Sequence, residues 1–301
     1  MYVQTDAFVR REEGFESVRP VRSQEGQGSC LIKAPSVDTI RVSVVVPSFN
    51  SGEYIAAALN SALSQTPPPL EVIVQDGGST DQTLEVLRTF GNKVNWRSEP
   101  DRGQSDALNR AIRRSSGDVV VWLNADDLLA PGAFTAVSTA FERHPDAEFV
   151  YGDFDMIRED GRRLRRYQSS EYDPSRVFAH GCYIFSGAIF YRRSLLNRIG
   201  PFDERLHACM DFDYLLRIGN APSAQIGAPV AGFRMHGGGK SSTLRSRFLR
   251  ESHEVRWRNA GASIRLRILT LALDGWSAVT MWTQPLRLTK AWSAIRSGKR
   301  L

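Results

Sequence analysis

A repeated alternation of short apolar runs and helix-like segments is the feature that most constrains the fold of this chain. The run Val42–Val46 is dominated by valine, which is typical of a strand covered on both faces in a parallel sheet. Helix-like segments of about 10–15 residues separate it from later runs, an order typical of right-handed βαβ units. The sequence therefore predicts an α/β fold with a mostly parallel sheet sandwiched by helices, followed by a C-terminal helical tail. The predicted strands are 42–46, 71–74, 94–97, 119–123, 148–157 and 186–191, and the predicted helices are 52–64, 80–90, 104–114, 131–143 and 210–217.

The positive charge of the chain is concentrated near its C-terminus. Residues 256–301 contain nine Lys and Arg against one acid, Asp274, while the rest of the chain carries 30 bases and 32 acids. This nearly neutral body argues against a nucleic-acid-binding protein, and we interpret the basic run Arg162–Arg166 as a solvated loop. We expect three regions: a mobile leader over residues 1–40, a main domain over 41–240, and a basic amphipathic helical tail over 241–301.

The basic tail allows two interpretations. Its longest charge-free stretch, Gly275–Leu286, is twelve residues long, shorter than the roughly 20 needed to span a bilayer. The tail over 256–301 can lie on an anionic membrane surface, or it can pack on the domain with its arginines in solvent. Residues 1–20 do not resemble a secretory signal, and the three cysteines form no CxxC pair. We therefore expect a cytoplasmic protein, which in the first of these cases is peripheral on the inner face of the plasma membrane.

Polar, turn-rich segments follow the first four predicted strands. Because the carboxyl ends of parallel strands meet at one edge, these segments should lie together where such sheets bind ligands. Asp126 and Asp127 follow an apolar strand directly, and their hard oxygen atoms suit Mg²⁺ or Mn²⁺. Asp76 can accept a hydrogen bond from a ligand N–H, although capping of the helix near Thr80 is an alternative role. The sequence contains neither GxGxxG nor GxxxxGK[ST], so a dinucleotide site or a P-loop is not supported.

Four of these segments carry recognisable motifs. They are 42–50 (VSVVVPSFN), 76–81 (DGGSTD), 101–109 (DRGQSDALN) and 123–127 (LNADD). In order and spacing they resemble the glycosyltransferases of family 2, and the resemblance covers roughly residues 40–240. It implies a Rossmann-like sheet of the GT-A type and a glycosyltransferase domain over 41–240.

The resemblance implies a nucleotide-sugar donor, most simply a UDP-sugar, bound at this edge. Asp76 would read the edge of the uracil ring, and the segment Gly103–Asn109 would hold the ribose and the sugar diphosphate. The residues implied to line the nucleotide are Pro47, Ser48, Asn50, Asp76, Asp101, Gly103, Gln104 and Asn109.

The segment 124–126 stands where the family has its DxD metal motif, with Asn124 in place of the first aspartate. Since an amide oxygen is a weaker ligand than a carboxylate, Asp126 is expected to be the main protein ligand of Mn²⁺ or Mg²⁺. Asn124 and Asp127 are implied to contact the donor sugar or diphosphate, with orientation of Asp126 as the other role for Asp127. His236 is implied to reach the metal or the diphosphate.

The segment Met210–Arg217 resembles the family's catalytic aspartate motif and points to Asp211 as the general base. Asp213, about 200° further round the helix, is expected to be structural. The implied reaction is inverting transfer of a sugar to a hydroxyl of a glycan or lipid-linked acceptor, in polysaccharide, cell-wall or lipid-linked glycan synthesis. The alternative is a catalytically degenerate, transferase-like binding protein that acts at the membrane surface.

Overall fold

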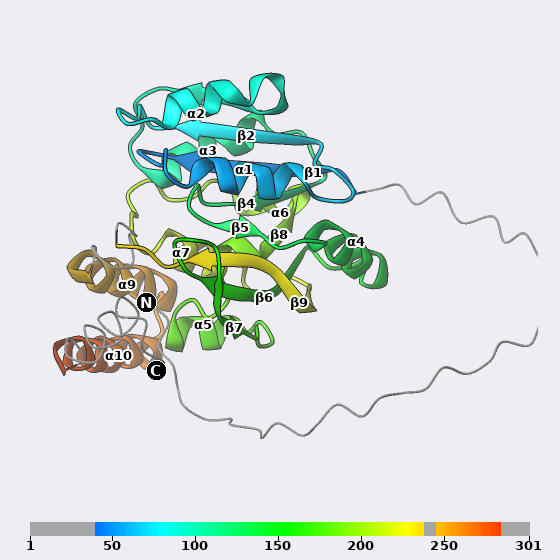
Figure 1. The fold of residues 1–301 in the computed structure, drawn as a ribbon. Helices are drawn as coiled ribbons and strands as arrows, with labels where there is room; N and C mark the ends of the chain where they lie inside the picture. The colour runs from blue at the N-terminus through cyan, green and yellow to red at the C-terminus, as the bar shows by residue number, and fades with distance from the viewer. Residues whose placement is uncertain (1–39, 238–244, 284–301) are drawn as a thin grey trace, which may run out of the picture.

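The computed structural model describes residues 40–237 and 245–283, which form a mixed sheet with helices on both faces (Figure 1). The leader predicted over residues 1–40 lies, apart from Ile40, outside the described residues. The strands are β1 (Val42–Ser48), β2 (Glu71–Asp76), β3 (Asn95–Ser98), β4 (Val119–Trp122), β5 (Leu128–Leu129), β6 (Phe149–Ile157), β7 (Arg163–Tyr167), β8 (Ile189–Arg192) and β9 (Ser223–Arg234). The helices are α1 (Ile55–Leu63), α2 (Thr83–Thr89), α3 (Gln104–Arg114), α4 (Ala133–Arg143), α5 (Pro174–His180), α6 (Arg193–Ile199), α7 (Met210–Ile218), α9 (Arg245–Ala260) and α10 (Ile264–Thr283), with 3₁₀ turns at Gly91–Lys93 and Ser186–Ala188.

The sheet has a parallel core in the first half of the chain. Its strand order is β3-β2-β1-β4-β8-β6-β9-β5, with β7 paired to β6. β1 is parallel to both β2 and β4, and β2 is parallel to β3. β8 is antiparallel to β4 and β6, whereas β6 and β9 are parallel. The carboxyl ends of β1, β2, β3 and β4 therefore lie at one edge of the sheet.

Successive side chains of β1 pack into two separate cores, one on each face of the sheet. Val44 and Val46 belong to the core that also contains side chains of α1, α2 and α4. Val45 belongs to the other core, with side chains of α3, α5, α6 and α7. Because side chains of a strand alternate between its faces, an uninterrupted valine run is what a sheet covered on both sides requires.

The predicted α/β fold with a mostly parallel core is confirmed, and α3 spans the predicted range 104–114. Two local interpretations were wrong. The predicted strand 186–191 begins only at Ile189, because Ser186–Ala188 form a 3₁₀ turn. The basic run expected to be a solvated loop forms most of β7, which pairs with β6 through its backbone, while Arg166 bonds Asp155 and the Tyr167 ring stacks on Phe154.

The described part of the tail forms two helices that lie side by side, and α9 contacts α7 (Figure 1). α9 packs on the domain through the fully buried Val255, and Arg256 is also buried, donating to the carbonyl of Phe178. α10 packs on α9 and leaves apolar side chains exposed, including Ile264 and Ile268. Among the described helices, none combines the length and apolar character needed to cross a membrane.

Candidate active site

The loops after β1 and β2 are tied together by polar contacts. Asn50, at φ +48°, donates its N–H to Ser79 Oγ at 2.7 Å and accepts from the Thr80 N–H at 2.9 Å. Asp76 is fully buried and accepts from the N–H groups of Gly78 and Ser79 and from the hydroxyls of Ser79 and Ser98. Asp76 therefore organises these loops. A nucleotide base that donates a hydrogen bond to Asp76 would have to share its carboxylate oxygens with these protein donors.

The end of β1 leaves a polar atom available at the same edge. Ser48 closes β1 beside Asp76, its register partner on β2. The hydroxyl of Ser48 is buried and has no hydrogen-bond partner among the described residues. A buried polar atom normally has a partner, so a ligand that enters at this edge would satisfy it. Pro47 precedes it within β1, also buried.

The loop after β3 approaches the loop after β2 closely. Asp101 accepts a 2.8 Å hydrogen bond from the Gly103 N–H. A Cβ at Gly77 would lie 2.6 Å from Asp101 Oδ2, so a larger residue there would have to displace the Asp101 side chain. Gly103 has φ +116°, and a Cβ there would meet the His207 ring at 2.9 Å. The chain before α3 is therefore enclosed between the β2 loop and the segment before α7.

The loop after β4 is held by a network that uses the whole side chain of Asn124. Its Oδ1 accepts from Trp122 Nε1 and Gln104 Nε2, both at 2.7 Å, and its Nδ2 donates to Asp127 Oδ2 at 2.7 Å. Asp127 is buried and also accepts from the Arg234 N–H at 2.9 Å. The implied contact of Asp127 with the donor sugar is therefore not supported, because its carboxylate is enclosed and orients the loop instead.

Asp126 and His236 form a pair at this edge. His236 Nε2 lies 2.9 Å from Asp126 Oδ2, and the hydrogen bond to Asp126 raises the pKa of His236. The His236 ring also packs on Tyr54, with the ring centres 4.7 Å apart. The side chains of Asp126 and His236 are 34 % and 12 % exposed, so the carboxylate remains open to a ligand.

This pair fits part of a divalent-cation site. Among the described residues, His, Cys, Asp and Glu side chains do not form a group of three or more suited to a metal ion. One carboxylate and one imidazole leave most of an octahedral shell open, which matches ions that complete their shell with substrate phosphates and water. The donor set of Asp126 and His236 is therefore compatible with Mn²⁺ or Mg²⁺ bound together with a diphosphate.

The start of α3 contacts the start of α7. Ser105 Oγ lies 3.0 Å from both the carbonyl of Leu206 and Met210 Sδ. Asn109, on the next turn of α3, uses its amide on the backbone of Phe202 and on Glu204. The expectation that Asn109 lines the nucleotide is not supported, because its side chain is buried and braces the segment before α7.

Asp211 follows Met210 in the first turn of α7. Burial raises the pKa of Asp211, although its carboxylate accepts the Phe212 N–H at 2.8 Å and a hydrogen bond from Cys182. Burial and the charge of Asp211 in turn raise the pKa of the Cys182 thiol. Asp211 is thus a carboxylate with raised proton affinity at a helix start that abuts α3.

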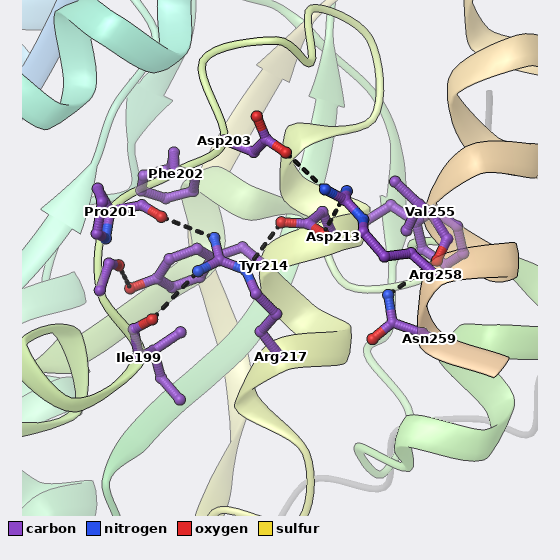
Figure 2. A network of polar contacts seen from close by, with 12 residues as sticks. Ile199, Pro201, Phe202, Asp203, Asp213, Tyr214, Arg217, Val255, Arg258 and Asn259 are labelled. Atoms are coloured by element: carbon purple, nitrogen blue, oxygen red, sulfur yellow. Dashed lines mark hydrogen bonds and ion pairs between the residues drawn. The ribbon is translucent and has the colours of Figure 1, made fainter. Parts of the chain in front are cut away.

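Asp213 faces away from this edge, as expected from its position on the helix. It is buried and bonds Arg217 at 2.8 Å and Arg258 of α9 at 3.0 Å (Figure 2). Arg258 also bonds Asp203 at 2.7 Å, which links α9 to the segment before α7. The structural role predicted for Asp213 agrees with these contacts.

Three residues at or near this edge were not anticipated. Phe49, in the loop after β1, is 61 % exposed. The presence of an aromatic residue in a polar loop could have singled it out from the sequence. Arg234 is buried and donates to the carbonyl of Asp126 at 2.7 Å. Glu251, on α9, accepts from the N–H groups of residues 207–209. No local pattern signals the last two, since both act on segments distant in the sequence.

Comparisons with known proteins agree with this geometry. The family model for glycosyl transferase family 2 matches residues 43–200. The chain is 27 % identical over 262 residues to a PGL/p-HBAD biosynthesis glycosyltransferase of Mycobacterium tuberculosis, covering 84 % of this chain and 98 % of the relative. It is 28 % identical over 191 residues to an uncharacterized glycosyltransferase of Rickettsia conorii, which is 59 % of this chain and 31 % of that protein.

Solved structures share the fold. S. aureus TarS 1–349 in complex with UDP-GlcNAc matches with a TM-score of 0.59 and 23 % identity, over 75 % of this chain and 68 % of that one. The match covers 40 % of the longer TarS chain. The mannosyltransferase PcManGT from Pyrobaculum calidifontis, in complex with GDP-Man and Mn²⁺, matches with a TM-score of 0.53 and 21 % identity, over 85 % and 81 % of the two chains. With more than half of its length matched by the family model, the chain belongs to glycosyl transferase family 2 and has the GT-A fold.

Proposed function

We propose that this glycosyltransferase moves a sugar from a UDP-sugar to an acceptor hydroxyl with inversion at the anomeric carbon. One observation carries the proposal: a chain of contacts joins the loop of Asp126, the candidate metal ligand, to the helix start that bears Asp211, the candidate base. Asn124, two residues before Asp126, bonds Gln104, and the adjacent Ser105 bonds Met210, which precedes Asp211. These contacts support placing both carboxylates at one edge of the sheet.

Asp211 acts as the general base in this proposal. The acceptor oxygen forms a bond to the anomeric carbon as the bond to the nucleoside diphosphate breaks, and the leaving group keeps that electron pair. The acceptor proton passes to a carboxylate oxygen of Asp211. The raised pKa of Asp211 supports this role, because a carboxylate with higher proton affinity is a stronger base.

Asp126 and His236 would hold Mn²⁺ or Mg²⁺ in this proposal. When bound, such an ion neutralises the charge that builds on the departing diphosphate. The chain's own part is to keep Asp126 in place. The backbone carbonyl of Asp126 accepts a hydrogen bond from Arg234 Nε at 2.7 Å. Its side-chain carboxylate is held by His236 Nε2.

The departure from the DxD motif at Asn124 gives the degenerate-binding alternative some support, but the network around this residue argues against it. The amide satisfies Trp122, Gln104 and Asp127 together. An aspartate would have no N–H to offer Asp127. Asn124 therefore matches the hydrogen-bonding needs of its neighbours. The Asp126 carboxylate nearby remains open to a ligand.

We further propose that the enzyme works at an anionic membrane surface, on a glycan or lipid-linked acceptor. Ile264, Ile268 and Leu271 lie within about 60° on α10 and are 74 %, 63 % and 59 % exposed. By the same helical geometry, Arg265 and Arg267 flank this apolar stripe on its two sides. An apolar stripe between bases suits the interface of an anionic leaflet.

Part of the basic tail is not available for such binding. Arg256 is buried against Phe178 and Phe212, and Arg258 pairs with Asp203 and Asp213. These two arginines hold α9 on the domain, whereas the packing interpretation of the tail expected its arginines in solvent. The membrane proposal therefore rests on α10 and on the bases beyond it in the sequence.

The donor proposal is tested with purified full-length protein and a panel of UDP- and GDP-sugars, with and without Mn²⁺. We expect one UDP-sugar to raise the melting temperature in the presence of Mn²⁺ and to be consumed when an acceptor is added. The TarS complex with UDP-GlcNAc supports starting from that donor. Stabilisation by GDP-sugars alone would contradict the choice of nucleotide, and no stabilisation by any donor would contradict the function.

A further inference from the structure

A carboxylate of α9 is buried against the chain that leads into α7. Glu251 is 4 % exposed, and its oxygens accept the N–H groups of His207 at 3.0 Å, Ala208 at 2.7 Å and Cys209 at 3.1 Å. Hydrogen bonds to an ionised acceptor are about twice as strong as neutral ones. One side chain thus fixes three consecutive backbone amides.

The anchored residues touch both sides of the candidate active site. Cys209 immediately precedes α7, and Asp211 lies in the first turn of that helix. The ring of His207 lies against Gly103, just before α3, where a Cβ would approach it to 2.9 Å. The segment that Glu251 anchors, residues 207–209, therefore determines the position of the start of α7 relative to the loop before α3.

We infer that Glu251 is a positioning residue for sugar transfer, which sets the place of the Asp211 carboxylate by anchoring the amides of residues 207–209. The inference rests on the proposed function, because it assumes that Asp211 accepts the acceptor proton. It also makes α9 part of the active site, although α9 lies outside residues 43–200, the range matched by the family model.

α9 has a second anchor that provides a matched control. Arg258, about two turns beyond Glu251, bonds Asp203 and Asp213 (Figure 2). These bonds hold α9 on the domain without touching the amides of residues 207–209. Loosening of α9 in general can therefore be separated from loss of the amide anchor.

The experiment compares Glu251→Gln with Arg258→Gln in the full-length protein. Glutamine keeps the size of the side chain but offers a single neutral oxygen. We expect Glu251→Gln to lower kcat about 10- to 100-fold, because an error of about 1 Å in a reacting group can cost about that much. Donor affinity should stay unchanged, and amide exchange at residues 207–209 should accelerate. Arg258→Gln should lower the melting temperature while kcat stays within about threefold.

A second variant keeps the test informative if Glu251→Gln does not fold. Glu251→Asp keeps the charge and withdraws the carboxylate by one methylene group, so we expect an intermediate kcat. Equal kcat losses in Glu251→Gln and Arg258→Gln would overturn the inference, as would wild-type kcat with accelerated exchange. If the wild-type protein transfers no sugar at all, the proposed function fails. The anchoring by Glu251 is tested separately, and unchanged amide exchange at residues 207–209 in Glu251→Gln would overturn it.

Discussion

Asn124 Nδ2 donates a 2.7 Å hydrogen bond to Asp127 Oδ2, so a neutral amide stands directly beside a buried carboxylate. Burial and the charge of Asp126 already raise the pKa of Asp127 well above its ordinary value. A carboxylate at position 124 would face Asp127 with an acceptor where a donor is needed. The asparagine that departs from the usual DxD form is thus the residue that this buried aspartate requires.

We predict that Asn124→Asp, which restores the usual form of the motif, destabilises the protein by about 2–3 kcal/mol, because a buried acceptor loses its donor. The loss should grow as pH rises, since both carboxyl groups must then ionise side by side. Thermal unfolding at pH 5 and pH 8 measures it. The double variant Asn124→Asp, Asp127→Asn exchanges donor and acceptor and should recover most of the stability. Equal stability of the single variant at both pH values would contradict this account.

Asp211→Asn and Asp213→Asn should change stability in opposite directions. Because the pKa of Asp211 is raised by burial, ionised Asp211 destabilises the folded protein above that pKa. Asp211→Asn should therefore raise the melting temperature at neutral pH, while transfer falls about 10²- to 10⁴-fold and donor binding persists.

Asp213→Asn is the matched control on the same helix. It replaces the buried carboxylate that pairs with Arg217 and Arg258 by a neutral amide, at a cost of about 1–3 kcal/mol given that both arginines are partly exposed. Calorimetry and initial rates measured on both variants test the pair. Near wild-type turnover in Asp211→Asn would remove this residue from the mechanism.

The pH dependence of kcat should report the protonation of Asp211. A base must be deprotonated to accept the acceptor proton, so kcat should fall as pH drops through the pKa of Asp211. Since burial raises this pKa above the ordinary 3.8, the fall should begin at a higher pH than an exposed aspartate would give. A kcat profile at saturating donor and acceptor measures this. An unchanged kcat down to the ordinary aspartate range would contradict the assignment.

Local pattern sufficed for the elements whose sequence matches their environment. The valine run of β1 and the helix 104–114 are covered on the faces that their periodicity predicts. β7 was missed because its arginines show no apolar alternation, and its strand conformation depends on pairing with β6. β9 was missed for a related reason: it carries Gly227, Gly232 and Pro229, and it forms by long-range pairing with β6.

The candidate site divides in the same way. Asp126, His236 and Asp211 were assigned from motif and position, and their roles remain proposals. Asn109 and Asp127 were assigned to the donor because they stand in the right motifs, but their side chains point into buried networks that spacing does not reveal. A motif thus predicts which loop forms the site, whereas partner contacts decide which of its side chains remain open.

The Asp126–His236 pair predicts metal-dependent donor binding. Asp126→Asn and His236→Gln should each reduce the Mn²⁺-dependent thermal shift caused by the donor, because each removes one protein ligand. His144, which is exposed on the far end of α4, provides the control His144→Gln. EDTA should abolish transfer by the wild-type protein, and Mn²⁺ should restore it. Full activity of the wild type after metal removal and in EDTA would contradict a metal role for this pair.

The exposed stripe of α10 predicts binding to anionic membranes. Ile268→Asp places a charge in the middle of the stripe, so affinity for phosphatidylglycerol vesicles should fall about tenfold. Asn92→Asp adds a charge of the same sign on an exposed turn between α2 and β3, and it should leave vesicle binding nearly unchanged. Vesicle co-sedimentation at low and high salt measures both variants, and binding by the wild type should weaken as salt screens Arg265 and Arg267. Equal vesicle binding by Ile268→Asp and the wild type would show that this stripe does not meet the bilayer. A change of oligomeric state in the same variant would then identify the stripe as a contact between copies of the chain.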